Sequence, residues 1–354
     1  MKTAHAAIGI SALALALAGC ADPPPAQHPP ATSAAATSTG GYKACLLTGE
    51  EDPTVGSPAA QAIAGLARAA NELGIQTERG LASETDEQAG AIQGLIDAHC
   101  NLVVGLGRNV SDAFVAAAKA NPGIQFAVMD ANPTELPPNL RPVLFRTHES
   151  GFLAGYLAAA HSKTGKVGAF GARAEPGVII YLDGFVQGVS HYNEAKQASV
   201  EAIGWSIADQ RGTFVHSDKD PFNDPEAGRA ATKQLTDQGA DVVLAVAAES
   251  GVGALEVAAE SAGTRIIWTG EDGCAVHEDH CGQILTSVVK DYQAALLELI
   301  KSESADRNVS GVFAASLRNG GTHLTGGEDE PEIGQLAQGI VEGRIKVTSA
   351  QAIG

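Results

Sequence analysis

Residues 222–253, FNDPEAGRAATKQLTDQGADVVLAVAAESGVG, decide the fold because this stretch passes from a helix into a strand and back into a helix. Alanine and leucine at helical spacing over 225–238 predict a helix, and the β-branched run at 241–247 predicts a buried strand. Residues 251–262 again have helical composition, and 265–269 predict the next strand. This alternation indicates parallel strands with helices on both faces of a sheet.

The same alternation continues in both directions along the chain. Upstream of residue 222, strands are predicted at 43–48, 75–79, 102–106, 124–130, 143–147, 167–171 and 199–203. The helices between them are predicted at 59–73, 86–98, 111–120, 150–161 and 178–192. Gly74 is expected to end the first of these helices, and a Thr85-x-x-Gln88 capping box to begin the second. Two such series in tandem predict two doubly wound lobes.

The first twenty residues are typical of an exported lipoprotein. Lys2 provides a positive charge, Ile8 to Leu17 form a short apolar run, and the run ends in Leu17-Ala18-Gly19-Cys20. This order predicts a signal peptide over residues 1–19. An uncleaved anchor helix is the alternative, but the apolar run is shorter than the roughly 20 residues that span a bilayer. The tetrad matches the bacterial lipobox, so Cys20 is expected to carry lipid, palmitate included, on the outer side of the cell membrane.

Residues 20–41 are rich in proline, alanine, serine and threonine and predict an extended tether. The whole chain carries 41 acidic and 23 basic residues, a formal net charge of −18. Such a surface repels phosphate backbones, so a nucleic-acid partner is excluded.

Four cysteines remain after Cys20, and an even number in an exported protein favours disulfides. Cys274 and Cys281 share one polar loop, so a local bridge is expected. Cys45 and Cys100 can form a second bridge if their strands are neighbours. A metal site, in which His277 and His280 join the two thiolates of the loop, is the alternative.

Small residues followed by a polar or acidic residue stand at the ends of the clearest predicted strands. They occur at 48–52, 107–109, 130–132, 248–251 and 270–272. Ligands of open α/β sheets bind beyond the carboxyl ends of the strands. Loops of this composition also serve as turns and helix caps, and the alternative role of Glu249 and Ser250 is to cap helix 251–262. Five such loops in two lobes predict a binding cleft between the lobes.

Several segments, in order, resemble the basic membrane protein family of ABC-transporter substrate-binding lipoproteins, which includes purine nucleoside receptors. They are FAVMDA (126–131), FRTHESGFLAGYLAA (145–159), YLDGFVQG (181–188), the opening stretch 222–253, TGEDG (269–273) and LTSVVKD (285–291). The resemblance implies a type I periplasmic-binding-protein fold, α/β in class, with two Rossmann-like lobes joined by three crossovers. Those crossovers would lie near 146–151, 269–274 and 315–325. The N-lobe would then contain residues 42–148 and 274–318, and the C-lobe residues 149–273 and 319–354.

The resemblance also implies roles for individual residues. Asp130 would lie near the ligand in the N-lobe, and Phe222 would stack on a nucleobase unless it packs as an ordinary hydrophobe at a helix edge. Asp272 would accept hydrogen bonds from ribose hydroxyls, and Lys290 would close on the ligand from the N-lobe. Glu249 completes this candidate set from its strand end.

The chain departs from the family pattern at residues 49–60. The family has a first-strand aspartate and a Phe-Asn pair that clamps and reads the base, whereas the equivalents here are Gly49 and residues 58–60, Pro-Ala-Ala. Asp52 is the candidate replacement for the missing carboxylate. One stacking face and one hydrogen-bonding reader are absent, which relaxes the expected selectivity for purine nucleosides.

The expected function is therefore a lipid-anchored, monomeric receptor that delivers a nucleoside or similar polar molecule to an ABC permease by hinge closure. It requires no cofactor or metal. A sensing or scavenging lipoprotein without a transporter is the alternative. An exported hydrolase is a third reading, but no Gly-x-Ser-x-Gly, His-Glu-x-x-His or Walker motif occurs in the sequence.

Overall fold

The computed structural model describes residue 1 and residues 41–306, 310–327 and 330–352. The rest of the predicted signal peptide, Cys20 and the tether up to residue 40 lie outside the described residues. Within the described part, no helix combines the length and apolar character that crossing a bilayer requires.

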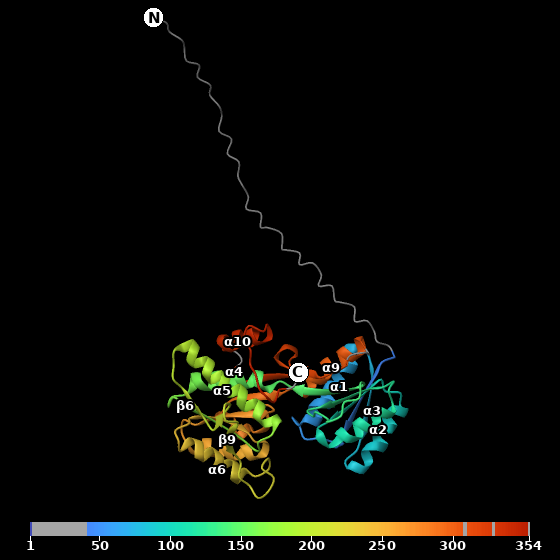
Figure 1. The fold of residues 1–354 in the computed structure, drawn as a ribbon, viewed down its shortest axis with the longest axis horizontal. Helices are drawn as coiled ribbons and strands as arrows, with labels where there is room; N and C mark the ends of the chain where they lie inside the picture. Colours follow the sequence, from blue (N-terminus) through green and yellow to red (C-terminus); the bar gives the residue numbers. More distant parts are fainter. Residues whose placement is uncertain (2–40, 307–309, 328–329, 353–354) are drawn as a thin grey trace, which may run out of the picture. The chain divides into compact units, whose positions relative to one another are not determined.

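The first lobe is built on a sheet of six parallel strands in the order β13-β5-β4-β3-β1-β2. Its strands are β1 (Lys43–Thr48), β2 (Gln76–Leu81), β3 (Leu102–Leu106), β4 (Gln125–Met129), β5 (Leu140–Phe145) and β13 (Phe313–Ala315). Alternate residues of β1 enter opposite cores, because Leu46 packs with α1 (Pro58–Leu73) and α9 (Tyr292–Ala305), whereas Leu47 packs with α2 (Gln88–Asp97) and α3 (Ser111–Ala120). This doubly wound layout is visible in Figure 1.

Helix ends in this lobe follow local chemistry. Ser57 caps α1 with its side chain, and Gly74 ends the helix at φ +64°, as predicted. The predicted capping box at Thr85 is wrong, because residues Thr85–Glu87 form a short 3-10 turn (η1) ahead of α2. Glu87 instead accepts from the backbone N–H groups of Ser83 and Glu84.

The second lobe contains a mixed sheet in the order β14-β12-β11-β10-β6-β9-β8, with β7 also paired to β6. Its strands are β6 (Lys166–Gly171), β7 (Glu201–Ile203), β8 (Trp205–Ser206), β9 (Arg211–Phe214), β10 (Val242–Val246), β11 (Arg265–Gly270), β12 (Ile284–Lys290) and β14 (Thr322–Thr325). One face is covered by α4 (Thr147–His161), α5 (Pro176–Lys196) and α10 (Pro331–Val341), and the other by α6 (Pro225–Thr236) and α7 (Val252–Glu260). The edge strands β14 and β8 are antiparallel to their neighbours.

The chain passes between the two sheets three times. The first crossover joins β5 to α4 and the third joins β13 to β14, both within the predicted ranges. The second was predicted at 269–274, and this is wrong. Strand β12 pairs with β11 in the second sheet, so the crossover follows Lys290 and leads into α9 of the first lobe. Residues 284–290 therefore belong to the second sheet and not to the N-lobe.

Helices α4 and α5 pack against each other through glycines. Gly151 and Gly155 of α4 face Gly184 and Gly188 of α5, and each lies against backbone of the other helix. A Cβ atom on Gly155 would stand 2.0 Å from the carbonyl oxygen of Phe185. The two helix backbones can approach this closely only because these positions lack side chains. Figure 1 shows the pair side by side.

Both predicted disulfides are present. Cys45 is bonded to Cys100 in the first lobe, and Cys274 is bonded to Cys281 in the second. The Cys45–Cys100 bridge joins β1 to the residue before its neighbour β3, as expected from adjacent strands. In the loop of the second bridge both sulfurs are engaged with each other, so they are not available as the thiolate ligands of the alternative metal site.

Candidate functional site

A cavity of about 600 Å³ is lined by both lobes at the carboxyl ends of their strands. The first lobe and its crossovers contribute Pro58, Gln61, Arg108, Asp130–Asn132, Leu144–Arg146 and Tyr292. The second contributes Thr147, Glu175–Val178, Ile180, Tyr181, Phe222, Val246–Glu249, Thr269–Glu271, Lys290, Gln351 and Ala352. Its size suits one small organic molecule.

The backbone turns sharply where four strands enter this cavity. Gly107, Asp130 and Ala248 follow β3, β4 and β10, Gly270 is the last residue of β11, and all four have φ between +46° and +101°. Glycine adopts this region freely, but Asp130 and Ala248 carry a side chain there. Such strain is concentrated at functional sites, where the surrounding fold holds it in place.

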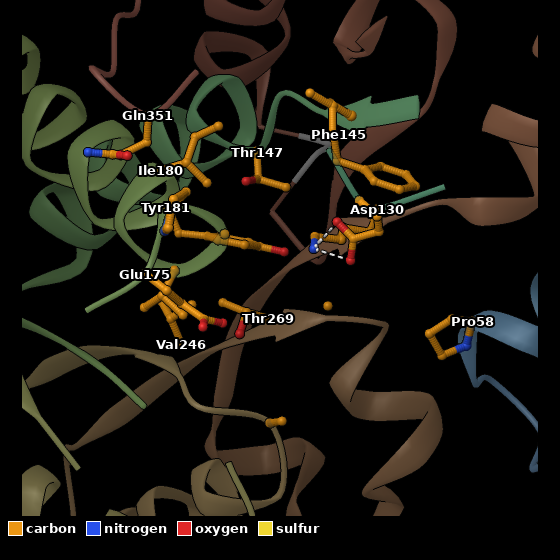
Figure 2. A pocket seen from close by; sticks show the side chains of 18 of the residues that line it. Pro58, Asp130, Phe145, Thr147, Glu175, Ile180, Tyr181, Val246, Thr269 and Gln351 are labelled. Atoms are coloured by element: carbon orange, nitrogen blue, oxygen red, sulfur yellow. Dashed lines mark hydrogen bonds and ion pairs between the residues drawn. The ribbon is translucent and has the colours of Figure 1, made fainter. Parts of the chain in front are cut away.

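Asp130 and Lys290 both line the cavity and form an ion pair, and Figure 2 shows the dashed contacts of Asp130. Lys290 Nζ lies 2.9 and 2.8 Å from the two carboxylate oxygens of Asp130, and Tyr292 donates its hydroxyl to Asp130 Oδ2 at 2.8 Å. Asp130 follows a strand of the first sheet and Lys290 ends a strand of the second. The contact therefore joins the two lobes beside the second crossover.

The ionisation of these three groups is coupled through their contacts. Burial raises the pKa of the Asp130 carboxyl, but Lys290 and the Tyr292 hydroxyl outweigh it and hold the pKa below its ordinary value. Burial lowers the pKa of Lys290, but Asp130 more than reverses this, so its pKa is raised. Burial and the Asp130 charge raise the pKa of Tyr292 well above its usual range. At neutral pH the pair is charged and Tyr292 is a neutral donor.

Aromatic rings border the ion pair and a second part of the cavity. Lys290 Nζ lies 5.7 Å from the ring centroid of Phe145 and 5.9 Å from that of Tyr181. The ring of Tyr181 reaches from α5 toward Asp130 in Figure 2, and burial raises its pKa to about 12. Elsewhere Arg173 places its guanidinium 5.0 Å from the ring centroid of Phe222. These rings offer flat apolar surfaces next to charged groups.

The charged groups lining the cavity are mostly neutralised within the protein. Arg108 pairs with Glu175 at 3.3 Å across the two lobes, and Arg146 pairs with Glu149 at 3.6 Å. Among the described residues, Glu249 and Glu271 have no cationic partner within ion-pair distance. Burial, and then the charge of Glu249, raise the pKa of Glu271. The uncompensated charge of the cavity is therefore negative.

We expect Glu249→Gln to lower the pKa of Glu271, because the substitution removes a neighbouring negative charge and leaves the burial unchanged. Carbon-13 NMR titration of the glutamate side-chain carboxyls measures this directly. Glu256→Gln, an exposed change on α7, serves as the control and should leave the Glu271 titration where it is. An unchanged Glu271 titration in Glu249→Gln would show that the two carboxylates do not interact.

Residues 57–338 match the family model described as ABC transporter substrate-binding protein, PnrA-like. The chain belongs to this family. The family is one of substrate-binding proteins and not of enzymes, which agrees with the absence of catalytic motifs from the sequence. Membership also agrees with the resemblance that the ordered segments at 126–291 indicated.

Curated relatives and solved structures agree with the family assignment. Basic membrane protein A2 of Borrelia garinii is 33% identical over 217 residues, which is 60% of this chain and 59% of the relative. Basic membrane protein A of Borreliella burgdorferi is 31% identical over 217 residues, 60% of this chain and 58% of that protein. The match thus spans less than two thirds of these relatives.

Two solved structures share the fold. An ABC transporter solute-binding protein from Aeropyrum pernix superposes with a TM-score of 0.63 at 22% identity, over 88% of this chain and 94% of that one. Another, from Conexibacter woesei, has a TM-score of 0.63 at 20% identity, over 87% and 98%. The fold is therefore that of periplasmic solute-binding proteins, as predicted.

Four of the six predicted binding residues line the cavity, namely Asp130, Phe222, Glu249 and Lys290. Lys290 enters from β12 of the second sheet, which corrects its predicted place in the N-lobe. Asp272 does not line the cavity; its side chain accepts from Cys274 N at 3.0 Å and caps α8 (Gly273–Val276). Asp52 is exposed and also lies outside the lining.

Sequence reasoning missed Glu271, Tyr181 and Tyr292. Glu271 occupies the cavity wall where Asp272 was expected, because Gly270 at φ +101° turns the chain immediately before it. Tyr292 had a usable signal, since it stands two residues after Lys290 at the end of a strand. Tyr181 had none, because it lies within a helix among buried apolar residues.

Proposed function

We propose that this protein is the substrate-binding component of an ABC importer and that it encloses a neutral, nucleoside-like molecule between its lobes. The observation that carries the proposal is the Asp130–Lys290 contact, which joins the lobes inside a cavity of about 600 Å³ in a member of a substrate-binding family. A ligand at this position touches both lobes, so it favours the state in which they are closed together.

The cavity chemistry supports a ligand with a flat ring and several hydroxyl groups. Phe222 and Tyr181 offer ring faces, and stacking on such a face is worth about 1–3 kcal/mol per base. Glu249 and Glu271 accept hydrogen bonds from hydroxyl or amino groups. Pro58, which stands in the segment where the family has Phe-Asn, lines the cavity without an aromatic face or an amide. Selectivity for one base is accordingly weaker than in a receptor with both.

The proposed cellular location of the protein is based on the first residues of the chain. The LAGC tetrad and the proline-rich segment after it support a lipid on Cys20 and a spacer of about twenty residues outside the cytoplasmic membrane. A tethered receptor meets a permease of the same membrane by motion in two dimensions, which raises their effective concentration. We propose that permease as the partner and a monomer as the working form.

Isothermal titration of the purified protein with adenosine, guanosine and inosine, and with their 5′-monophosphates, tests this function. We expect at least one nucleoside to bind, and its monophosphate to bind about 100-fold more weakly. The cations of the cavity are already paired, and the phosphate would face Glu249 and Glu271. Glu271→Ala should lose nucleoside binding, whereas Glu278→Ala, an exposed change in the same segment, should keep it. A protein that binds none of these nucleosides but is stabilised against heat by an unrelated solute contradicts the nucleoside assignment.

A further inference from the structure

Two segments from different lobes meet beside the cavity-lining residues Pro58 and Glu271. Gly56 belongs to the loop before α1 of the first lobe, and Val276 belongs to α8 of the second. A Cβ atom on Gly56 would stand 3.0 Å from Val276 Cγ1 and 3.9 Å from Glu271 Oε2, a cavity-lining atom. Because a Cα–Cβ bond is about 1.5 Å long, Gly56 Cα lies within about 4.5 Å of Val276 Cγ1, which is contact distance for apolar groups.

Each loop is fixed within its own lobe. On the second lobe, the Asp272 side chain caps α8, and the Cys274–Cys281 disulfide closes the segment that contains Val276. On the first lobe, Gln61 Nε2 donates to the carbonyl oxygen of Gly56 at 2.8 Å. Gln61 Oε1 accepts from Tyr292 N at 3.1 Å, immediately after the second crossover. Through these two hydrogen bonds Gln61 links Gly56 to Tyr292, which follows the second crossover between the lobes.

We propose that the Gly56–Val276 contact, here called the closure contact, holds the cleft closed over its ligand and that the Cys274–Cys281 disulfide positions it. This inference rests on the proposed function. Gly56 and Val276 do not touch the solute; they are positioning residues that set the population of the closed state. Ligand affinity scales with that population, so loosening the closure contact weakens binding without changing any group that faces the ligand.

Gly56→Ala tests the closure contact from the first lobe. The added methyl meets Val276, and Gly56 has φ +86°, which strains alanine. We expect ligand affinity to fall about tenfold. We also expect hydrogen exchange at amides 273–283 to accelerate in the ligand-free protein, although the substitution lies in the other lobe. Gly343→Ala is the matched control, because Gly343 has φ +75° and no atom within 4 Å of an added Cβ.

Val276→Ala and the double substitution Cys274→Ser/Cys281→Ser test the contact from the second lobe. Each should weaken binding, and Val276→Ala should recover part of the affinity lost in Gly56→Ala because it makes room for the methyl. Equal affinities and equal exchange at 273–283 in Gly56→Ala and Gly343→Ala would overturn the inference. If the unmodified protein binds no nucleoside, the proposed function fails, while the exchange measurement still decides whether the closure contact holds the two loops together.

Discussion

Gly155→Ala is expected to lower the stability of the second lobe by at least about 3 kcal/mol, because the new methyl overlaps backbone that cannot move aside. The Cβ atom would lie 2.0 Å from the carbonyl oxygen of Phe185 on α5. Relief requires the two helices to separate, which opens the core beneath them. Differential scanning calorimetry should show the melting temperature lowered by about 4–5 °C for a chain of this size.

Gly94→Ala is the matched control for that prediction. Gly94 lies inside α2, and no atom stands within 4 Å of an added Cβ. Alanine in an open helix interior should raise stability by about 0.5–1 kcal/mol. The two substitutions thus have opposite expected signs although both replace a helical glycine. A Gly155→Ala protein that melts with the unmodified one would show that α4 and α5 are less closely packed than described.

Lys290→Met is expected to weaken nucleoside binding about 30-fold and to lower the free energy of unfolding by about 2 kcal/mol at neutral pH. Asp130 would keep its burial and lose its cation. The expected loss of unfolding free energy is smaller than is usual on breaking a buried ion pair, because the side chain of Asp130 is 34% exposed. Titration calorimetry and urea unfolding measure the two effects. Lys301→Met, at a partly exposed lysine that pairs with Glu298, should change stability by less than about 1 kcal/mol.

The pH dependence of Lys290→Met separates loss of charge from loss of packing. In the unmodified protein the low pKa of Asp130 stabilises the fold above the ordinary carboxyl range, and this is lost as pH falls through the folded pKa. The raised pKa of Lys290 stabilises it below the ordinary lysine pKa, and this is lost as pH rises through the folded value. Without the lysine the Asp130 pKa rises relative to the unmodified protein, so the variant should regain stability as pH falls from neutral toward the ordinary carboxyl range. A deficit that stays constant over that interval would indicate packing alone.

The alternation of strands and helices was readable because each element carries its own local pattern. The buried run of β10 and the cap of α1 at Gly74 depend on neighbours in sequence, and both are where the sequence placed them. Strand β12 lies within a family segment but was not among the predicted strands. The sheet to which β12 belongs was not predictable. Ile266 pairs with Ile284, and the sequence of the segment between them carries no signal for either lobe. Sheet membership is decided by long-range packing. Because β12 was not assigned to the second sheet, the second crossover was predicted too early in the chain.

The candidate site shows the same division between local and distant information. Asp130 follows a predicted strand, so the rule for open α/β sheets located it, whereas Lys290 was named only by the family resemblance. Glu271 and Asp272 are neighbours in one turn, and only the backbone rotation at Gly270 decides which of them enters the cavity. Asp52 follows a strand as well, yet its loop is turned outward while Arg79 donates to the Glu51 carbonyl oxygen. Composition predicted four of the five loops that border the cavity, all but 48–52, and could not orient their side chains.

The second crossover has a consequence for anyone who wishes to redesign this receptor as a sensor. Lys290 and Tyr292 flank the connecting residue and both bind Asp130, so the crossover and the lining of the cavity share the same side chains. A change made there to recruit a new analyte would also alter how readily the lobes rotate. Glu249 and Glu271 belong to turns of one lobe only and take no part in the crossover. They are the positions at which substitutions can change ligand specificity while the rotation of the lobes, which a sensor would report, is preserved.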